Sequence, residues 1–277
     1  MAQFVSKISP EKILSASAAI AKVISKTEPI ISVRNLTVGY GDEPIIKGIS
    51  FEVLPGEIFA IMGRSGCGKT TLFKATIGLL ESEEGEVIID GDKVLPVTYN
   101  AAQGVLRKIG VLFQSSALFS SMTLAENVAF PIQQYTSLPE NTIGRLVELK
   151  LSEVGLAGHE RLLPRELSGG MQKRAALARA MALDPKILFF DEPTAGQDPV
   201  TARELDETIL KINQGLGTTI VLVTHELESV FRIAQRVIVI DSDEKGIIAE
   251  GSPQELRDSC NDPRVRDFFN RVSSEER

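Results

Sequence analysis

The residues with the clearest chemistry form the stretch Gly63-Arg64-Ser65-Gly66-Cys67-Gly68-Lys69-Thr70, which matches the phosphate-binding pattern G-x-x-x-x-G-K-[ST] throughout. An apolar run precedes it and a helical pattern follows, so an incidental glycine-rich turn is a poor alternative. Glycines let backbone N–H groups surround an anion at the N-terminus of the next helix. Lys69 supplies a charge to the β- and γ-phosphates, the Thr70 hydroxyl suits Mg2+, and Thr71 adds a phosphate contact. A nucleoside triphosphate with Mg2+ is the expected ligand.

Cys67 lies within this loop, at the start of the expected helix. A helix N-terminus can lower the pKa of a thiol and make it reactive. One hypothesis is therefore that thiol reagents inhibit the protein and that the nucleotide protects it. The plainer interpretation is a small loop residue without special reactivity.

A pair of acids ends an apolar strand pattern. The run Ile187-Leu188-Phe189-Phe190 leads directly into Asp191 and Glu192. A buried strand has no reason to end in two carboxylates unless a cation or a reaction lies there. We expect Asp191 to hold Mg2+ through water, and Glu192 to face the γ-phosphate and polarise the attacking water. The alternative, an acidic pair at a solvated strand end, is disfavoured by the phosphate loop in the same chain.

Strand and helix patterns alternate around these residues, which indicates an α/β fold with a mostly parallel sheet and helices on both faces. Between residues 115 and 165 the strand character is weak, and this insertion is expected to form a second, helical lobe. No internal repeat is visible, so the chain carries one nucleotide-binding unit. Strand patterns cover residues 30–40, 45–53, 57–62, 87–90, 109–113, 187–190, 219–223, 237–240 and 246–250. Helical patterns cover residues 68–80, 124–130, 143–154, 170–182, 200–214 and 227–234.

Composition limits the classes of partner. The net charge of -7 argues against a broad nucleic-acid-binding surface. No apolar run approaches the ~18 residues that a membrane span needs. Two cysteines give no disulfide framework and fit a reducing cytosol. The first 28 residues place Ile13, Ile20 and Ile24 near one helical face, which is typical of a short surface helix; a targeting segment is the less favoured alternative.

The phosphate loop and the acidic pair, taken with Leu167-Ser168-Gly169-Gly170-Met171 between them, resemble the ABC-type ATPases over about residues 30 to 260. The resemblance implies a P-loop NTPase fold with a mixed sheet, an antiparallel β subdomain and a helical subdomain. It also implies that Tyr40 stacks on adenine and that His225 is the switch histidine at the γ-phosphate. Gln114 would sense Mg2+ and the γ-phosphate and open the helical lobe, where transmembrane partners dock.

The resemblance further implies a homodimer in which two copies meet face to face. Ser168, Gly169, Gly170 and Met171 form the signature motif, and the loop that ends in Asp198 links the two active sites. The signature precedes a helical pattern, so it offers an anion-seeking helix N-terminus. One molecule already has a complete phosphate cradle, so this second cradle makes sense if it closes over the ATP of a second copy.

Three departures from the commonest ABC pattern are similar to the phospholipid-trafficking, Mla-type branch. They are Met171 in place of the usual Gln, Gln197 in place of the usual Leu, and the segment Asp262 to Phe269. That branch implies a permease, a lipid-binding substrate-shuttle protein, a small STAS-like regulatory subunit and a peripheral position on the cytoplasmic face of the inner membrane. The alternative within the family is another substrate, such as an amino acid, a metal or an organic solvent.

Other classes fit less well. A DNA-repair or chromosome-organising ATPase inserts a long coiled coil between the phosphate loop and the signature, and this chain has no sustained heptads there. A translation-associated ABC protein carries two such units, and this chain has one. A pure interaction module would not need a suitable residue at every catalytic position, and this chain has one at each.

We expect three regions: an N-terminal extension (1–29), an ABC ATPase domain (30–258) with its helical subdomain at about 115–182, and a C-terminal tail (259–277). The tail carries Val265, Phe268 and Phe269 on an otherwise charged segment. One hypothesis is that residues 262–277 contact a neighbouring subunit. The alternative is that the three apolar side chains pack on their own domain.

Overall fold

The computed structural model describes residues 28–41, 43–95 and 103–270, and the helical pattern expected near the N-terminus lies outside them. The described strands are β1 (Ile31–Tyr40), β2 (Glu43–Val53), β3 (Ile58–Gly63), β4 (Glu84–Ile89), β5 (Asp92–Lys93), β6 (Ile109–Leu112), β7 (Ile187–Asp191), β8 (Thr219–Val223), β9 (Arg236–Asp241) and β10 (Gly246–Gly251). The described helices are α2 (Lys69–Thr76), α3 (Gln103–Leu106), α4 (Leu124–Tyr135), α5 (Glu140–Glu153), α6 (Gly169–Ala180), α7 (Pro199–Leu216), α8 (Leu227–Ile233), α9 (Pro253–Asp258) and α10 (Pro263–Phe269), with a 3-10 turn, η1 (Pro164–Glu166).

Two sheets form the centre of the protein. The larger has the strand order β10-β9-β3-β8-β7-β6; its neighbours pair in parallel except for the antiparallel pair of β9 and β10. The smaller has the order β2-β1-β4-β5 with antiparallel pairs throughout. A mixed sheet, an antiparallel sheet and a helical region therefore confirm the fold class expected from the sequence.

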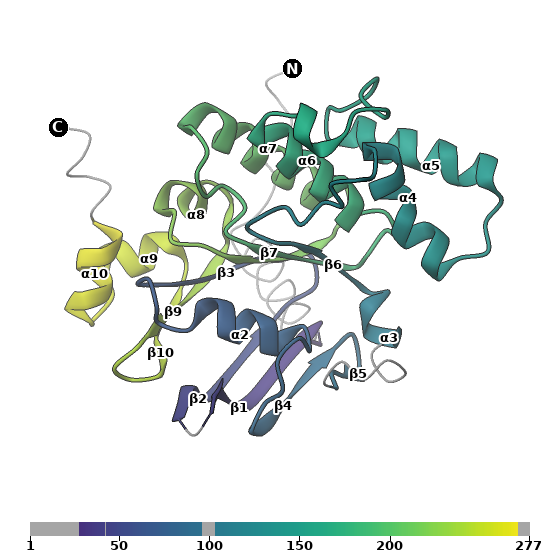
Figure 1. The fold of residues 1–277 in the computed structure, drawn as a ribbon. Helices are drawn as coiled ribbons and strands as arrows, with labels where there is room; N and C mark the ends of the chain where they lie inside the picture. Colours follow the sequence, from purple (N-terminus) through teal and green to yellow (C-terminus); the bar gives the residue numbers. More distant parts are fainter. Residues whose placement is uncertain (1–27, 42, 96–102, 271–277) are drawn as a thin grey trace, which may run out of the picture.

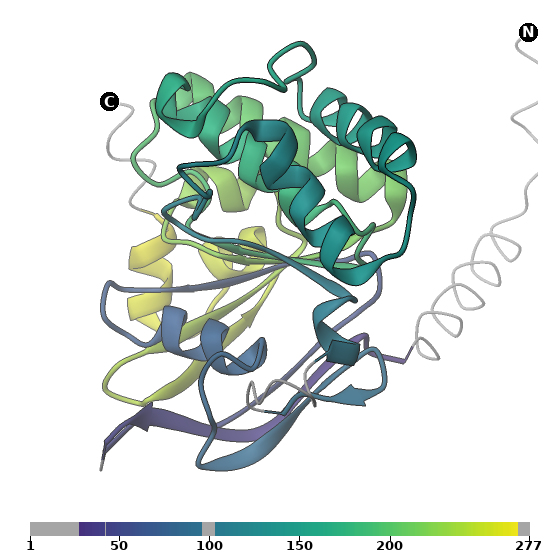
Figure 2. The ribbon, with the colours of Figure 1, turned by 45° about the vertical axis from the view of Figure 1, so that its right-hand side comes forward.

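The larger sheet separates two layers (Figure 1, Figure 2). Helices α4 to α7 lie over one face, and α2 with the smaller sheet lies over the other. Alternate residues of β3 divide between the two layers: Ile58, Ala60 and Met62 join the core under the helices, whereas Phe59 and Ile61 join the core around α2. Both faces of this strand are buried, which explains why its sequence is a continuous apolar run.

The helical region is fixed to the sheet partly by a buried amide. Asn127 in α4 is fully buried; its side-chain nitrogen donates to the carbonyls of Phe119, Met122 and Thr123 at 3.0 to 3.2 Å. Its side-chain oxygen accepts from the backbone N–H of Phe119 at 2.9 Å. The segment that leads from β6 into the helices is therefore held in one conformation.

Several element boundaries differ from those expected. The helix after the phosphate loop ends at Thr76 and not near residue 80, because Gly78 takes a left-handed conformation (φ 78°). Helix α4 continues through Pro131 to Tyr135, since packing of the buried Ile132 outweighs the backbone bond that proline removes. The short helices α3, α9 and α10 were not expected from periodicity, which is weak over so few residues.

Candidate active site

A pocket of about 650 Å3 lies at the carboxyl end of β3, where the phosphate loop joins α2. Ligands of open α/β sheets bind at the carboxyl ends of the strands, so its position suits a nucleotide site. The pocket gathers residues that follow β3, β6, β7 and β8, which lie far apart in the sequence. Its lining consists of Ile45, Gly63, Arg64, Ser65, Gly66, Gly68, Lys69, Thr70, Thr71, Gln114, Glu192, His225, Leu227 and Phe268.

Close packing explains two glycines of the loop. A Cβ at Gly63 would lie 2.4 Å from the carbonyl oxygen of Ile240. Gly68 has a left-handed conformation (φ 101°), and a Cβ there would lie 2.8 Å from side-chain atoms of Ile45 and Ile46. Only glycine fits both positions, so the loop can approach an anion with its backbone.

Lys69 is held inside the phosphate loop. Its ammonium donates to the carbonyl oxygens of Gly63 at 2.9 Å and Arg64 at 3.1 Å, and the residue is 7% exposed. Thr71, also buried, lines the same pocket. The cradle expected from the sequence is therefore assembled around a fixed positive charge.

Asp191 ends β7 beside the loop. It is 7% exposed, the Thr70 hydroxyl hydrogen-bonds to its carboxylate, and its Oδ1 atom has no hydrogen-bond partner among the described residues. Burial raises the pKa of the Asp191 carboxyl, and the adjacent charge of Glu192 raises it further. Lys74 and Lys69 lower it to a smaller extent. A buried carboxylate oxygen without a partner, next to a hydroxyl, is a donor set that suits a divalent cation.

Glu192 takes a left-handed backbone conformation (φ 49°), which is unfavourable for a non-glycine residue and occurs preferentially at functional sites. Its backbone N–H donates to Val223 at 2.8 Å. Its Oε1 atom lies 2.8 Å from Nδ1 of His225, and its Oε2 atom accepts from the Thr224 hydroxyl at 3.3 Å. The Glu192 side chain is 10% exposed and that of His225 is 56% exposed. Contacts to both oxygens hold the carboxylate at the edge of the pocket.

Sequence reasoning did not identify Thr224 as a site residue. A polar residue directly after an apolar strand was the available signal, the same one that marks the acids after β7. The Thr224 hydroxyl also accepts the backbone N–H of Glu226 at 3.0 Å, so it fixes the turn that carries His225.

Gln114 and Tyr40 differ in their relation to the phosphate pocket: Gln114 lines it and Tyr40 does not. Gln114 directly follows β6, is exposed and lines the pocket. Tyr40 ends β1, is 57% exposed and pairs with Glu43, two residues before the pocket residue Ile45. Tyr40 does not line the phosphate pocket itself; its exposed ring lies at the neighbouring end of the smaller sheet.

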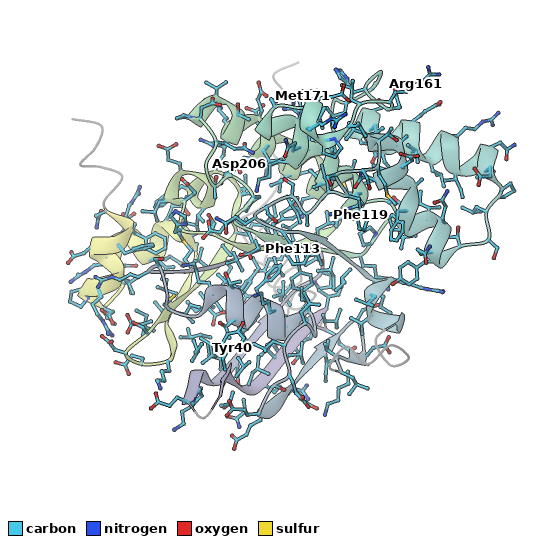
Figure 3. The ribbon with its side chains drawn as sticks, in the orientation of Figure 1. Tyr40, Phe113, Phe119, Arg161, Met171 and Asp206 are labelled. Atoms are coloured by element: carbon cyan, nitrogen blue, oxygen red, sulfur yellow. The ribbon has the colours of Figure 1, made fainter. Side chains whose placement is uncertain are left out.

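The signature residues lie apart from the pocket. Ser168 caps α6 by accepting the backbone N–H of Met171 at 3.3 Å, while the Met171 side chain packs against the core. Gly169 is exposed, and a Cβ there would meet no atom within 4 Å; a Cβ at Gly170 would lie 2.5 Å from a side chain of α7. Figure 3 shows Met171 and Tyr40 at opposite ends of the molecule. One copy of the chain therefore does not bring its signature to its own phosphate loop.

Asp198, expected in the dimer loop, caps α7 within its own chain. Its carboxylate accepts the backbone N–H groups of Val200 and Thr201, both at 3.1 Å, and the Thr201 hydroxyl at 2.6 Å. These bonds lower the pKa of the Asp198 carboxyl. The amide of the preceding Gln197 is buried and has no hydrogen-bond partner in the described part of the chain.

A buried ion pair joins α7, which begins after Asp198, to α8, which follows His225. Asp206 of α7 is fully buried and accepts hydrogen bonds from the hydroxyl of Ser229 at 2.9 Å and from the guanidinium of Arg232 at 2.5 Å, both on α8. Burial raises the pKa of the Asp206 carboxyl, and these two bonds lower it. Breaking such a pair leaves a buried charge without compensation, so the two helices are expected to move together.

The structure argues against the reactive-thiol hypothesis for Cys67. The residue is 1% exposed, and burial raises the pKa of its thiol more than the nearby Lys69 lowers it. The helix N-terminus does not compensate for the apolar surroundings, which include the core around α2. Cys67 is a small buried residue of the loop.

The C-terminal segment packs mainly on its own domain. Val265 and Phe269 are buried. The Phe269 ring packs edge to face against Phe231 of α8, with 5.9 Å between the ring centres. Phe268 is half-buried and lines the phosphate-loop pocket, which sequence reasoning did not foresee. The described part of the tail thus favours the alternative of packing within the domain, and contact with a neighbouring subunit stays a prediction.

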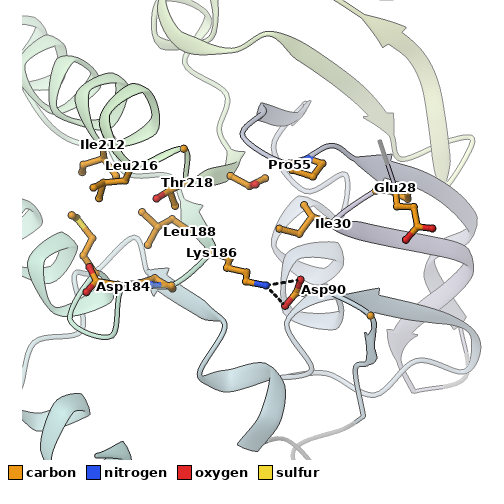
Figure 4. A pocket seen from close by; sticks show the side chains of 16 residues that line it. Glu28, Ile30, Pro55, Asp90, Asp184, Lys186, Leu188, Ile212, Leu216 and Thr218 are labelled. Carbon is orange, nitrogen blue, oxygen red and sulfur yellow. Dashed lines mark hydrogen bonds and ion pairs between the residues drawn. The ribbon is translucent and has the colours of Figure 1, made fainter. Parts of the chain in front are cut away.

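A second pocket of about 770 Å3 lies at the opposite edge of the sheet, around the amino ends of β7 and β8 (Figure 4). Lys186 and Asp90 form an ion pair across it at 2.9 Å, between apolar residues such as Leu188 and Ile212. It contains none of the predicted site residues and no glycine-rich cradle. Its size alone does not make it the nucleotide site.

Comparison with known proteins agrees with this geometry. A family model described as "ABC transporter" matches residues 46–195, more than half of the chain. An intermembrane phospholipid transport system ATP-binding protein, MlaF, of Haemophilus influenzae is 45% identical over 87% of this chain and 90% of its own. A probable ribonucleotide transport ATP-binding protein, mkl, of Mycobacterium leprae is 38% identical over 87% of this chain and 68% of its own.

Solved structures give the same result. The dimeric post-hydrolysis structure of the ATP-binding cassette MJ0796, bound to ADP and Pi, superposes with a TM-score of 0.72 at 29% identity. The match covers 80% of this chain and 98% of that cassette. Within the described residues, no helix is both long enough and apolar enough to cross a membrane. The family match over more than half of the chain and the 45% identity to MlaF, together with the phosphate loop and the strand-end acidic pair, show that the chain belongs to the ATP-binding, ATP-hydrolysing subunits of ABC transporters.

Proposed function

We propose that this protein is the ATPase subunit of a transporter that moves phospholipid, and that it works as a homodimer. Each ATP would be held between the phosphate loop of one copy and Ser168, Gly169 and Gly170 of the other. The observation that supports this most directly is the exposed signature helix N-terminus, which lies outside the pocket of its own chain. ATP binding would close the dimer, and hydrolysis would reopen it.

Mg2+ fits the polar groups that meet beside the end of β7, from α2, from the segment after β6 and from β7 itself. The Thr70 hydroxyl and the Gln114 amide oxygen would bind it directly, and Asp191 would bind through water. The unpartnered Oδ1 atom of Asp191 is the structural reason for this assignment. When bound, the cation neutralises charge on the β- and γ-phosphate oxygens.

Hydrolysis would rest on Glu192. Its carboxylate takes a proton from water as the water oxygen bonds to the γ-phosphorus, while the bond to the bridging oxygen of ADP breaks and ADP leaves. His225, bonded to Glu192 at 2.8 Å and largely exposed, would orient the carboxylate and contact the γ-phosphate. Lys69 would stabilise the charge on the β- and γ-phosphates from inside the loop.

The exposed ring of Tyr40 would stack on adenine. Replacing Tyr40 with Ala should raise the KM for ATP about 5- to 150-fold, since stacking of a base on an aromatic side chain contributes ~1–3 kcal/mol. The kcat should change little, because the phosphate cradle is untouched. Steady-state kinetics of Tyr40→Ala and Tyr40→Phe test this: Phe should keep the wild-type KM, and an unchanged KM in the Ala variant would exclude the stacking role.

A permease would dock beside the segment that follows Gln114. A shallow groove of about 350 Å3 there is lined by aromatic side chains, among them Phe113, Phe119 and Tyr135. Phe119 is 42% exposed, and the guanidinium of Arg179 lies 5.7 Å from its ring centre. Exposed aromatic residues beside an arginine are typical of protein interfaces.

The phospholipid assignment is supported by the 45% identity to an intermembrane phospholipid transport system ATP-binding protein over 90% of that protein. We further propose the partners of such a system: a permease, a lipid-binding substrate-shuttle protein and a small STAS-like subunit, with this chain on the cytoplasmic face of the inner membrane. In a Gram-negative cell, the system would maintain the lipid asymmetry of the outer membrane. The relative named for probable ribonucleotide transport keeps another substrate as the second candidate.

Purification of the tagged chain with its membrane partners tests the substrate. We expect mass spectrometry to find a permease and phospholipid, and the reconstituted complex to transfer phospholipid between vesicles only with ATP. Lys69→Ala provides the matched control, because it should assemble but not drive transfer. Copurified ribonucleotides, amino acids or metals without phospholipid would contradict the assignment.

A further inference from the structure

Lys173 is a buried lysine in α6, one turn after the signature, and nothing in the reaction described above uses it. The residue is 6% exposed. Its ammonium donates to the backbone carbonyl oxygen of Gln114 at 2.5 Å and reaches that of Glu192 at 3.5 Å. The side chains of Gln114 and Glu192 both line the nucleotide pocket. One buried charge therefore connects the signature helix to two residues of the catalytic site.

The same helix holds the loop after Gln114 at a second point. Arg179 donates to the carbonyl oxygens of Ser116 at 3.0 Å and Ala117 at 2.8 Å. Ser116 and Ala117 both have left-handed backbone conformations (φ 63° and 48°), which non-glycine residues adopt only when their surroundings impose it. The loop is thus fixed to α6 and is not free to move separately.

The surroundings of the Lys173 ammonium show why it is retained inside the protein. Burial lowers its pKa, and the charges of Asp191 and Glu192 raise it. A buried ammonium is unfavourable unless hydrogen bonds and opposite charges compensate, and here both come from the catalytic region.

We propose that Lys173 is a positioning residue that joins the two active sites of the dimer. The N-terminus of its helix would serve the ATP of the partner copy, while its ammonium fixes the backbone of Gln114 and Glu192 in its own chain. When the signature of one copy closes on the ATP of its partner, Lys173 would then align Gln114 and Glu192 around the ATP of its own copy. This inference rests on the proposed dimer with sites shared between copies.

Three variants test the proposal. Lys173→Met keeps the approximate volume and removes every donor; Lys173→Arg keeps charge and donors. Lys150→Met is the matched control, because Lys150 is another buried lysine (side chain 3% exposed) whose partners, Asp184 and Glu153, lie outside the nucleotide pocket. Each is compared with wild type for kcat, KM for ATP, melting temperature and ATP-dependent dimerisation.

We expect Lys173→Met to lower kcat about tenfold to a hundredfold, the value of a lost charged hydrogen bond, with a much smaller change in KM. ATP-dependent dimerisation should weaken, and Lys173→Arg should recover most of both. Lys150→Met should lower the melting temperature and leave kcat unchanged. Wild-type kcat and dimerisation in Lys173→Met, or an equal loss of kcat in Lys150→Met, would overturn the proposal. The two proposals can fail separately. Absence of an ATP-dependent dimer in the wild-type chain would reject the proposed function. An unchanged kcat in Lys173→Met would reject the positioning role of Lys173.

Discussion

The Glu192→Gln variant is expected to bind ATP normally and to lose hydrolysis by about 100- to 10,000-fold, the usual contribution of a general base. The amide keeps the size of the side chain and an oxygen for the Thr224 hydroxyl, but it cannot take a proton from water. The phosphate loop, with Lys69 held at its centre, is unchanged. The ATP-bound dimer should therefore accumulate, because it can close and cannot reopen.

Steady-state phosphate release, nucleotide binding and size-exclusion chromatography with ATP measure these three consequences. Glu207→Gln is a suitable control, since Glu207 is an exposed acid of α7 that pairs with Arg203 on the surface. It should behave as wild type. Near-normal turnover in Glu192→Gln would show that another group activates the water.

The Gly169→Asp variant should fold as well as wild type and fail to hydrolyse ATP. Gly169 is exposed, has no atom within 4 Å of a Cβ position, and lies in the first turn of α6. An aspartate there is compatible with the single chain and even suits a helix N-terminus. In a closed dimer, the aspartate would face the γ-phosphate of the partner's ATP. Repulsion between these two negative groups costs several kcal/mol, so hydrolysis should fall by at least ~100-fold.

Gly144→Asp is a closely matched control, because Gly144 is also exposed and helical and has no atom within 4 Å of a Cβ position. Both variants should keep the wild-type melting temperature. Only Gly169→Asp should lose ATP-dependent dimerisation and turnover. Full activity in Gly169→Asp would mean that the signature does not meet a nucleotide.

Much of this fold follows from local pattern. The apolar run before Gly63 and the run that ends in Asp191 are buried on both faces, so their strand character and their position in the central sheet were predictable. The end of the helix after the phosphate loop was not, because a left-handed Gly78 stops it while the apolar pattern continues to Leu80. Helix α10 was missed for a related reason: seven residues carry too little periodicity to distinguish a helix from an apolar cluster.

For the site, sequence motifs pointed to residues that the fold brings into one pocket, such as Lys69 and Glu192. They did not identify residues that act through position alone. Lys173 acts by bonding to two backbone carbonyl oxygens, and backbone acceptors leave no mark in a sequence. For Cys67 the sequence left a reactive thiol and an inert loop residue both open, because burial, which a motif does not show, decides the pKa of the thiol. Phe268 enters the pocket only because α10 folds back onto the domain.

The central claim is that each active site is built from two copies of the chain. The most direct test mixes two inactive variants: Lys69→Ala, which lacks the phosphate-loop charge, and Gly169→Asp, which lacks a usable signature. A heterodimer of the two contains one site in which the phosphate loop and the signature are both intact. We predict that ATP hydrolysis reappears on mixing, at less than half the wild-type rate because the altered signature cannot align the catalytic residues of its own chain, although each variant alone is inactive. Hydrolysis by the mixture that never exceeds the sum of its two components would contradict the account.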